Sequence, residues 1–178
     1  APLFRALAKE MDVRVYFAHK ATPKDQSEAG FGIEFDWDID LFEGYRHFFL
    51  RNRSCKPSLD SFYGCDTPEV KEITRTEKFD AFLVMGWNLK SYWQAVLACR
   101  RLGVRVLVRG DSNLSTPRLW LKKVVKELAW PIMLKQFDTF LVVGSRARHY
   151  LLHYGVSEER MFTVPHFIDN QRFKAAST

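Results

Sequence analysis

Three short segments of this sequence combine glycine with polar side chains that could hold a polar ligand. They are Gly86-Trp87-Asn88, Arg109-Gly110-Asp111-Ser112 and Gly144-Ser145-Arg146. Together they provide hydrogen-bond donors, one carboxylate, two guanidinium groups and one large aromatic face. Groups of these kinds bind sugar-like or phosphate-bearing molecules, whose oxygens exchange hydrogen bonds with them. These segments are therefore the candidate ligand-binding site.

Each of the three segments stands between an apolar run and an amphipathic stretch, which is the pattern of strand, turn and helix. The apolar runs cover residues 82–85, 104–108 and 140–143. Parallel strands need crossover connections, so this alternation predicts a doubly wound, Rossmann-like α/β fold with one parallel sheet covered on both faces. Ligands of such sheets bind outside the carboxyl ends of the strands. We therefore expect the three segments to converge there.

A purely structural interpretation of the same residues is also open. Asn88 and Ser145 could cap the helices that follow them, and the glycines could form tight turns. Asp111 with Ser112 could satisfy backbone donors in their loop. Arg109 needs a further explanation, because a guanidinium group at the end of a buried strand is costly unless it is paired. Either Asp111 or a ligand is expected to pair with it.

The helical pattern that follows Thr116 has two distinct faces. Its apolar stripe, which we expect to pack against the sheet, comprises Leu121, Val124, Val125, Leu128 and Ile132. Its basic stripe comprises Arg118, Lys122 and Lys126, beside Lys123. This basic stripe is either a solvated face or a peripheral contact with the inner, anionic face of a membrane.

The first half of the chain is less regular. A helix is expected over residues 3–9, a strand over residues 13–18 and another strand around residues 45–50. Residues 20–68 are expected to form a functional loop or to carry small elements. Four aromatic residues there indicate packing rather than disorder: Phe31, Phe35, Trp37 and Phe42. Because such a sheet should begin with a strand, the opening helix predicts that the first strand is missing.

Length and composition indicate a single folded domain. The chain has 178 residues, of which 47% are hydrophobic and 27% are charged, as in ordinary globular domains. We expect a Rossmann-like domain over residues 1–165 and the start of a linker over residues 166–178. No apolar run approaches the roughly 20 residues that span a bilayer, and no secretory signal is recognisable.

The charge and the cysteines narrow the expected partners and location. A net charge of +6 favours an anionic partner. Nucleic acid is not expected, because no nucleic-acid-binding motif is present and the basic residues are dispersed. Cys55, Cys65 and Cys99 lack C-x-x-C spacing, which indicates reduced thiols and a cytoplasmic location. The alternative for Cys55 and Cys65 is a disulfide across one loop.

Metal binding is not predicted. Asp36, Asp38 and Asp40 alternate with apolar residues, as in a half-exposed strand, and their spacing lacks the glycine of a calcium loop. His149 and His153 lie one helical turn apart, but no glutamate between them completes a metalloprotease-like motif. Both features are therefore taken as structural.

Taken together, the motifs resemble the group 1 (family 4) retaining glycosyltransferases of GT-B fold. The resemblance is carried by Phe31-Gly32, Phe35-Asp36-Trp37-Asp38, Gly44-Tyr45, Phe79-Asp80-Ala81, Gly86-Trp87, Arg109-Gly110-Asp111-Ser112, Phe137-Asp138-Thr139, Val143-Gly144-Ser145, Tyr150, Gly155-Val156, Val164-Pro165, Ile168-Asp169-Asn170 and Phe173. It implies the N-terminal, acceptor-binding half of such an enzyme. In the family, a second domain with an E-x7-E motif holds the nucleotide-sugar, and this chain ends before that domain. Many members carry a histidine at the turn of Gly110, so no catalytic residue is assigned.

Two functions are compatible with these observations. The first is half of a metal-independent transferase that moves a sugar from a nucleotide-sugar, used as substrate without a cofactor, to a glycan, lipid or small-molecule acceptor. This half alone is expected to be inactive. The alternative is a stand-alone Rossmann-like nucleotide- or cofactor-binding module without transferase activity. That alternative is weakened because the chain has no P-loop motif, and Gly30-Phe31-Gly32 lacks the third glycine of a dinucleotide fingerprint.

Overall fold

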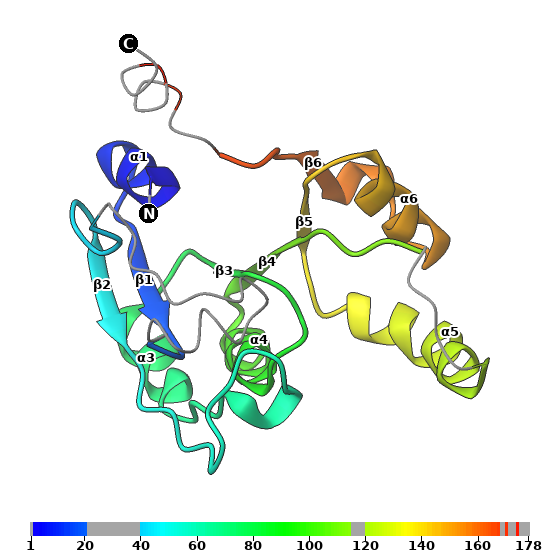
Figure 1. Ribbon diagram of the computed structural model, residues 1–178, viewed down its shortest axis with the longest axis horizontal. Coiled ribbons are helices and arrows are strands. Elements are labelled where there is room, and N and C mark those ends of the chain that lie inside the picture. Colours follow the sequence, from blue (N-terminus) through cyan, green and yellow to red (C-terminus); the bar gives the residue numbers. More distant parts are fainter. Residues whose placement is uncertain (1, 21–39, 115–119, 168–169, 171–173, 175–178) are drawn as a thin grey trace. The chain divides into compact units, whose positions relative to one another are not determined.

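A computed structural model describes residues 2–20, 40–114, 120–167, 170 and 174 (Figure 1). The chain divides into two compact units, one formed by residues 1–67 and 166–178 and the other by residues 68–165. Several predictions fall outside the described residues. They concern the start of the helix expected after Thr116, and Gly30-Phe31-Gly32, Phe35, Asp36, Trp37, Asp38 and Arg118. The prediction of a preceding strand concerns residues that this chain does not contain, and it stays a prediction, as do the domain limits.

The second unit has an α/β fold with one parallel sheet. Its strands are β3 (Ala81–Val84), β4 (Arg105–Gly110), β5 (Thr139–Val142) and β6 (Met161–Thr163), which pair in that order. The pairing is parallel throughout, with Val84 opposite Val108, and Val108 opposite Phe140. The predicted α/β class and parallel pairing are confirmed. Strand β6 was not expected, because a run of three residues carries no periodicity.

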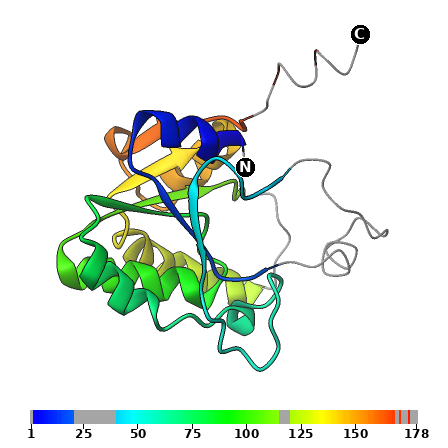
Figure 2. The same ribbon diagram turned by 90° about the vertical axis from the view of Figure 1, so that its left-hand side faces the viewer.

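Helices alternate with these strands. They are α3 (Val70–Glu77), α4 (Lys90–Leu102), α5 (Trp120–Leu134) and α6 (Ser145–His153), and the short 3-10 helix η3 (Glu158–Arg160) leads into β6. Helices α3 and α4 lie side by side (Figure 2). Helix α4 ends where predicted, at Gly103, whose left-handed backbone (φ 72°) closes the helix. Helix α3 was not expected from the sequence.

The core of the second unit lies on one face of the sheet. Val84, Val106, Val108, Phe140 and Val142 are each at most 2% exposed. Their strand neighbours Leu83, Leu107 and Leu141 point to the other face and are only half-buried, because successive side chains in a strand alternate. The buried face packs against residues of the helices, among them Val96 of α4 and Tyr150 of α6.

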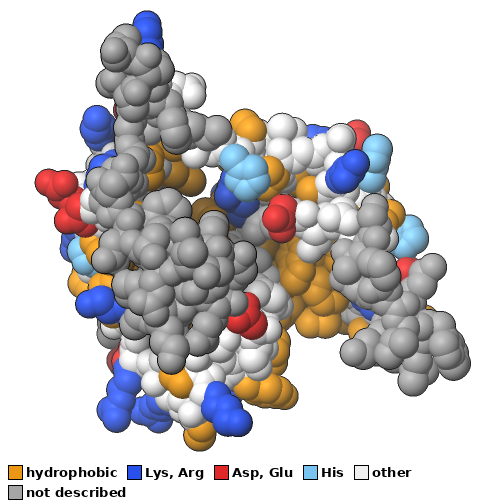
Figure 3. All heavy atoms as spheres, viewed as in Figure 1, with side chains coloured by type: hydrophobic (Ala, Val, Ile, Leu, Met, Phe, Trp, Pro, Cys, Tyr) orange, Lys and Arg blue, Asp and Glu red, His pale blue; other side chains and the backbone are white. Residues whose placement is uncertain are grey.

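The expected packing of the α5 apolar stripe is wrong at Leu128 and Ile132, and the side chains of Leu121, Val124 and Val125 lie outside the described residues. Leu128 is 73% exposed and Ile132 is 64% exposed, whereas Leu134 is 2% exposed. Trp130 of the same helix packs against the core instead. Helix α5 has apolar residues on two sides, and the larger indole of Trp130 occupies the inner side. Hydrophobic side chains therefore reach the surface, as they do at several places in Figure 3.

Asp138, which directly precedes β5, forms hydrogen bonds with β4 and α4. Its Oδ2 accepts a hydrogen bond from the backbone N–H of Val106 at 2.7 Å, and its Oδ1 accepts one from Arg100 at 3.0 Å. Its own backbone N–H donates to the Val106 carbonyl at 2.8 Å. The residue therefore fixes the start of β5 against β4, because it satisfies a buried backbone donor at the strand entrance.

The first unit contains a second, two-stranded sheet. Helix α1 (Pro2–Glu10) precedes β1 (Arg14–Phe17), which pairs in parallel with β2 (Arg46–Phe49). All three elements were predicted, but the single expected sheet is two sheets in the described residues. Phe42 packs on Phe17 with ring centroids 5.3 Å apart, which confirms the packing expected of that aromatic residue. A 3-10 helix, η2 (Phe62–Gly64), lies in the loop after β2.

No helix in the described part of the chain is both long and apolar enough to cross a membrane.

Candidate functional site

The three predicted segments lie at the carboxyl ends of neighbouring strands. Gly86-Trp87-Asn88 follows β3, Arg109 and Gly110 are the last residues of β4, and Gly144-Ser145-Arg146 follows β5. Since the three strands are parallel and adjacent, their carboxyl ends share one edge of the sheet. The structure therefore brings the three segments to the same edge, as predicted.

A shallow depression lies at this edge, where about 200 Å³ of space between atoms includes open solvent and leaves no enclosed room for a water molecule. We call it the strand-end depression. It is lined by Trp87, Val108, Gly110, Ser112, Phe140, Leu141, Ala147, Tyr150 and Leu151. Three of the predicted residues thus line it, and the sequence analysis missed its apolar floor. The alternation of buried and half-buried positions along β4 and β5 could have indicated that Val108 and Phe140 face inward. Nothing in the sequence distinguishes the residues beneath the depression from the other core residues.

Trp87 forms one wall of the strand-end depression and is also part of the core. Its ring stacks on Tyr150 (centroids 6.1 Å apart, 15° between planes) and meets Trp130 edge-on (5.6 Å, 85°). A Cβ atom added at Gly110 would lie 3.1 Å from the Trp87 ring, closer than a normal van der Waals contact. Gly110 therefore lets the indole lie this close to β4, which gives both residues a structural role.

The interpretation of Asn88 and Ser145 as helix caps is wrong. Leu89 is the N-cap of α4 and Gly144 is the N-cap of α6, and neither provides a side-chain capping bond. Asn88 instead places its Oδ1 over Gly86, whose φ of +134° requires glycine. Asn88, Ser145 and Arg146 are all exposed. Their polar groups are therefore accessible to solvent at the same edge of the sheet.

Arg109 has at least one partner within the chain. Its Nη2 donates to the carbonyl oxygen of Pro165 at 3.2 Å, so a backbone acceptor takes part of the role that was expected of Asp111 or a ligand. Asp111 itself is exposed and Ser112 is half-buried. A carboxylate and a hydroxyl group thus stand at the rim of the strand-end depression.

The residues considered for metal binding make structural contacts. Asp40 Oδ1 accepts hydrogen bonds from the backbone N–H groups of Phe42 (2.7 Å) and Glu43 (3.1 Å), and the bond from Phe42 is the main cause of its lowered pKa. His153 Nε2 lies 3.0 Å from Glu127 of α5, while His149 is exposed. Within the described ranges, no three His, Cys, Asp or Glu side chains are grouped closely enough to hold a metal ion.

The basic stripe expected on α5 is interrupted at Lys126. Its ammonium group lies over the rings of Trp130 (5.0 Å), Tyr150 (4.6 Å) and Tyr154 (5.2 Å). Such cation–π contacts hold the charge against the protein. The side chains of Lys122 and Lys123 lie outside the described residues. Lys126 is therefore a link between α5 and α6 rather than part of a solvated basic face.

The cysteines are free thiols. Cys55 is exposed, and Cys65 and Cys99 are buried, so the disulfide between Cys55 and Cys65 is not formed. Burial raises the pKa of Cys99 to about 11 and also raises the pKa of Cys65. Both buried thiols are therefore protonated and unreactive at neutral pH.

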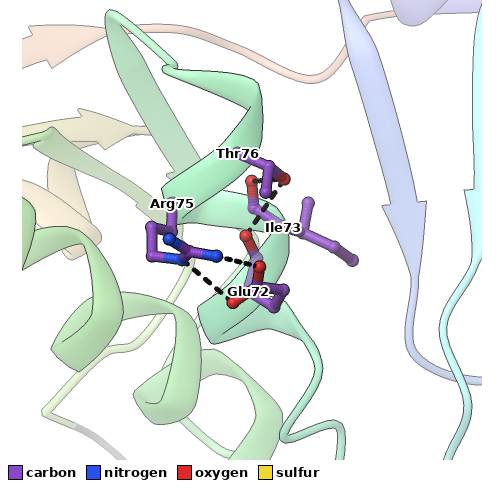
Figure 4. A network of polar contacts seen from close by, with 4 residues as sticks. All are labelled: Glu72, Ile73, Arg75 and Thr76. Carbon is purple, nitrogen blue, oxygen red and sulfur yellow. Dashed lines mark hydrogen bonds and ion pairs between the residues drawn. The ribbon is translucent and has the colours of Figure 1, made fainter.

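The exposed ion pair on α3 does not mark a second site. In α3, Arg75 Nε donates to Glu72 at 3.0 Å, and the Thr76 hydroxyl donates to the carbonyl oxygens of Glu72 and Ile73 (Figure 4). Glu72 and Arg75 are exposed and lie three residues apart on one helix face. Such pairs contribute little to stability and are common on solvated helices.

Comparison with known proteins identifies one family. Residues 3–172 match the model of Glycosyltransferase Family 4. No curated protein matches the chain.

Proposed function

This chain belongs to glycosyltransferase family 4, and we propose that it supplies the acceptor side of an enzyme that transfers a sugar from a nucleotide-sugar to a glycan, lipid or small-molecule acceptor. The observation that carries the proposal is the strand-end depression, whose apolar floor is bordered by polar side chains that the helix termini do not use. Parallel sheets bind their ligands at this edge.

The chemistry of the strand-end depression suits a sugar ring. A pyranose has a rim of hydroxyl groups, and Ser112, a half-buried residue of the lining, can exchange hydrogen bonds with them. Tyr150 and Phe140 are each 1% exposed, so they form the packed base beneath the site and do not contact a ligand themselves. Asp111 follows Gly110 directly and is exposed, so its carboxylate can accept a hydrogen bond from an acceptor hydroxyl. Asn88 and Ser145 offer further donors and acceptors. We propose these residues as acceptor-positioning groups together with Arg109 and Arg146, while Gly86, Trp87, Gly110 and Gly144 form the packed turns that hold them in place.

The proposed catalytic contribution of this half is positional and electrostatic. An acceptor held with its attacking hydroxyl beside the anomeric carbon gains rate because orientation entropy is lost on binding rather than in the transition state. A cleft shared with the donor half would exclude water and place fixed donors at the leaving diphosphate. No metal ion is required for these steps. The nucleotide-sugar is held mainly by the donor half, so residues 1–178 alone are proposed to be inactive.

The test uses an enzyme that carries both halves. Asp111→Asn and Ser112→Ala are expected to lower the transfer rate by at least about tenfold while the melting temperature stays constant, because both side chains are at the rim and not in the core. Asp80→Asn is the matched control, since Asp80 is an exposed carboxylate at the opposite end of β3. Normal transfer by both rim variants would remove Asp111 and Ser112 from the site.

The alternative function, a stand-alone nucleotide-binding module, makes a different prediction. Such a module would bind nucleotides in the absence of any second domain, whereas an acceptor half would not. Titration of the 178-residue chain with nucleotides and dinucleotides separates the two.

A further inference from the structure

An ordered loop in the first unit exposes apolar side chains to solvent. We call residues 51–66 the Asn52 loop; it follows β2 (Figure 1) and its regular structure is limited to the 3-10 helix η2. Leu59 is 48% exposed, Phe62 is 41% exposed and Tyr63 is 69% exposed. Phe62 and Tyr63 pack edge-on with ring centroids 5.1 Å apart. Three apolar side chains within five residues of sequence therefore face water, which is costly unless another surface covers them.

One asparagine closes the base of the Asn52 loop. Its Nδ2 donates to the carbonyl of Gly64 at 2.8 Å, and its Oδ1 accepts from the backbone N–H groups of Ser54 (2.9 Å) and Asp66 (2.9 Å). The backbone N–H of Arg53 adds a bond to the Asp66 carbonyl at 2.7 Å. The two ends of the loop are thus joined by three hydrogen bonds, and the bond from Ser54 fixes the Asn52 side chain.

A second group of contacts fixes the tip of the Asn52 loop. The backbone N–H of Ser58 donates to Gly64 at 3.1 Å, and the Ser58 hydroxyl accepts from the N–H of Asp60 at 3.0 Å. A Cβ atom at Gly64 would overlap the Ser58 carbonyl, so only glycine allows this closure. The tip is therefore ordered before any partner arrives, and binding need not order it at the cost of affinity.

The charges around the apolar tip favour an anionic surface. Arg51, Arg53 and Lys56 are exposed, against one exposed carboxylate, Asp60. The whole chain also carries a net charge of +6. Aromatic rings with a polar edge, such as tyrosine, partition into the headgroup region of bilayers, and neighbouring Arg and Lys side chains bind anionic lipids there.

We propose that the Asn52 loop is a docking site for an anionic lipid membrane, with Leu59, Phe62 and Tyr63 entering the headgroup region and Arg53 and Lys56 contacting lipid phosphates. This places peripheral membrane contact on the first unit rather than on α5, where Lys126 is held by aromatic rings. The proposal is independent of sugar transfer. A soluble protein or a saccharide as the partner would be an opposite outcome of the test below.

Cys55 provides a built-in reporter for the test. It is an exposed thiol within the Asn52 loop, whereas Cys65 and Cys99 are buried, so an environment-sensitive thiol dye labels it selectively. Vesicles with about one-third phosphatidylglycerol are expected to shift the dye emission to the blue and to carry the protein upward in flotation. Phosphatidylcholine vesicles are expected to do neither, because the cations then have no anionic partner.

Paired variants assign the effect to the loop. Phe62→Ser with Tyr63→Ser, and separately Arg53→Gln with Lys56→Gln, are each expected to weaken vesicle binding by roughly tenfold or more. Leu97→Ser with Leu102→Ser is the matched control, because both leucines are 46% exposed on α4. Tyr63→Ser alone serves if the first double variant loses its native circular dichroism. Unchanged flotation of the folded loop variants would overturn the proposal, as would a dye response to soluble saccharides but not to vesicles.

Discussion

The strand-end depression and the Asn52 loop are both ordered, but different interactions hold them. In the strand-end depression, aromatic rings pack on one another and on the sheet, so that Trp87 is braced by Tyr150 and Trp130. In the Asn52 loop, side-chain-to-backbone hydrogen bonds fix the chain and the aromatic rings face outward. An aromatic residue near a site is therefore not evidence of ligand contact by itself. What matters is whether the rest of the structure already occupies its faces.

The largest expected effect is on Trp87. Trp87→Ala should lower the free energy of unfolding by about 3 kcal/mol, because it removes an indole that packs on the core. Trp87→Phe should cost less, about 1 kcal/mol, since a ring remains against Gly110. Urea unfolding measures both. If Trp87→Ala kept its stability but lost acceptor binding, Trp87 would be a ligand-contacting residue. The proposed difference between a packed aromatic site and the exposed aromatic rings of the Asn52 loop would then be wrong.

The buried thiol of Cys99 in α4 and the exposed thiol of Cys55 in the Asn52 loop should respond differently to alkaline pH. The pKa of Cys99 is raised by burial to about 11 from an ordinary value of 9.0, so folding favours its protonated form. This contribution is fully present below pH 9 and is lost as the pH rises through 11, for a total of about 2 to 3 kcal/mol. Comparing wild type with Cys99→Ala in urea melts between pH 8 and pH 11 isolates it.

The Cys55→Ala variant is the control for that comparison, because Cys55 is exposed. Its stability should follow the wild-type pH dependence. A Cys99→Ala variant whose stability falls with pH as steeply as that of wild type would show that another group is responsible.

Asn52→Ala should open the Asn52 loop with a smaller effect on global stability. The change removes three hydrogen bonds and should cost about 1 to 2 kcal/mol. Hydrogen exchange should show lost protection at the backbone amides of Arg53, Ser58 and Gly64, while the amides of β4 and β5 stay protected. Asn52→Asp keeps the two accepted bonds and should have a smaller effect. Protection that persists in Asn52→Ala would mean that other contacts hold the loop.

The smallest expected effect on stability is a difference between alanine variants of two glycines in the candidate site, Gly110 and Gly144. Gly110→Ala should cost about 1 kcal/mol and alter the near-ultraviolet circular dichroism, because the new methyl group meets the Trp87 ring. Gly144→Ala should leave both unchanged, since Gly144 has an extended backbone and open space around it. Equal behaviour of the two variants would contradict the close approach of Trp87 to β4.

The sequence predicted those parts of the fold that depend on local periodicity. The alternation of apolar runs with helical patterns was sufficient for β3, β4, β5, α4 and α6, and the glycine at position 103 was sufficient for the end of α4. It also predicted that the polar turns share one edge of the sheet, because parallel pairing and crossover connections require this. Helix α5 was predicted as a helix, but Leu128 and Ile132 were expected inside and are exposed, since the helix also carries apolar residues such as Trp130 and Leu134 on another side.

Other features depend on contacts between distant residues, which no local pattern reveals. Asn52 reaches Gly64 across twelve positions, and its role follows only from the closed loop. The floor of the strand-end depression combines β4, β5 and α6. The caps of α4 and α6 were misassigned because Asn88 and Ser145 have favourable residue types for capping, whereas the backbone becomes helical one residue away from the position predicted in each case.

The most direct test of the central claim is the melting temperature of the 178-residue chain in the presence of nucleotide-sugars. A ligand stabilises a protein only in proportion to its binding to the folded state. If this chain is the acceptor half of the transferase, a panel of nucleotide-sugars at millimolar concentration should shift the melting temperature by less than about 1 °C. A shift of several degrees with any of them would show that these residues bind the donor, and would contradict the proposed function.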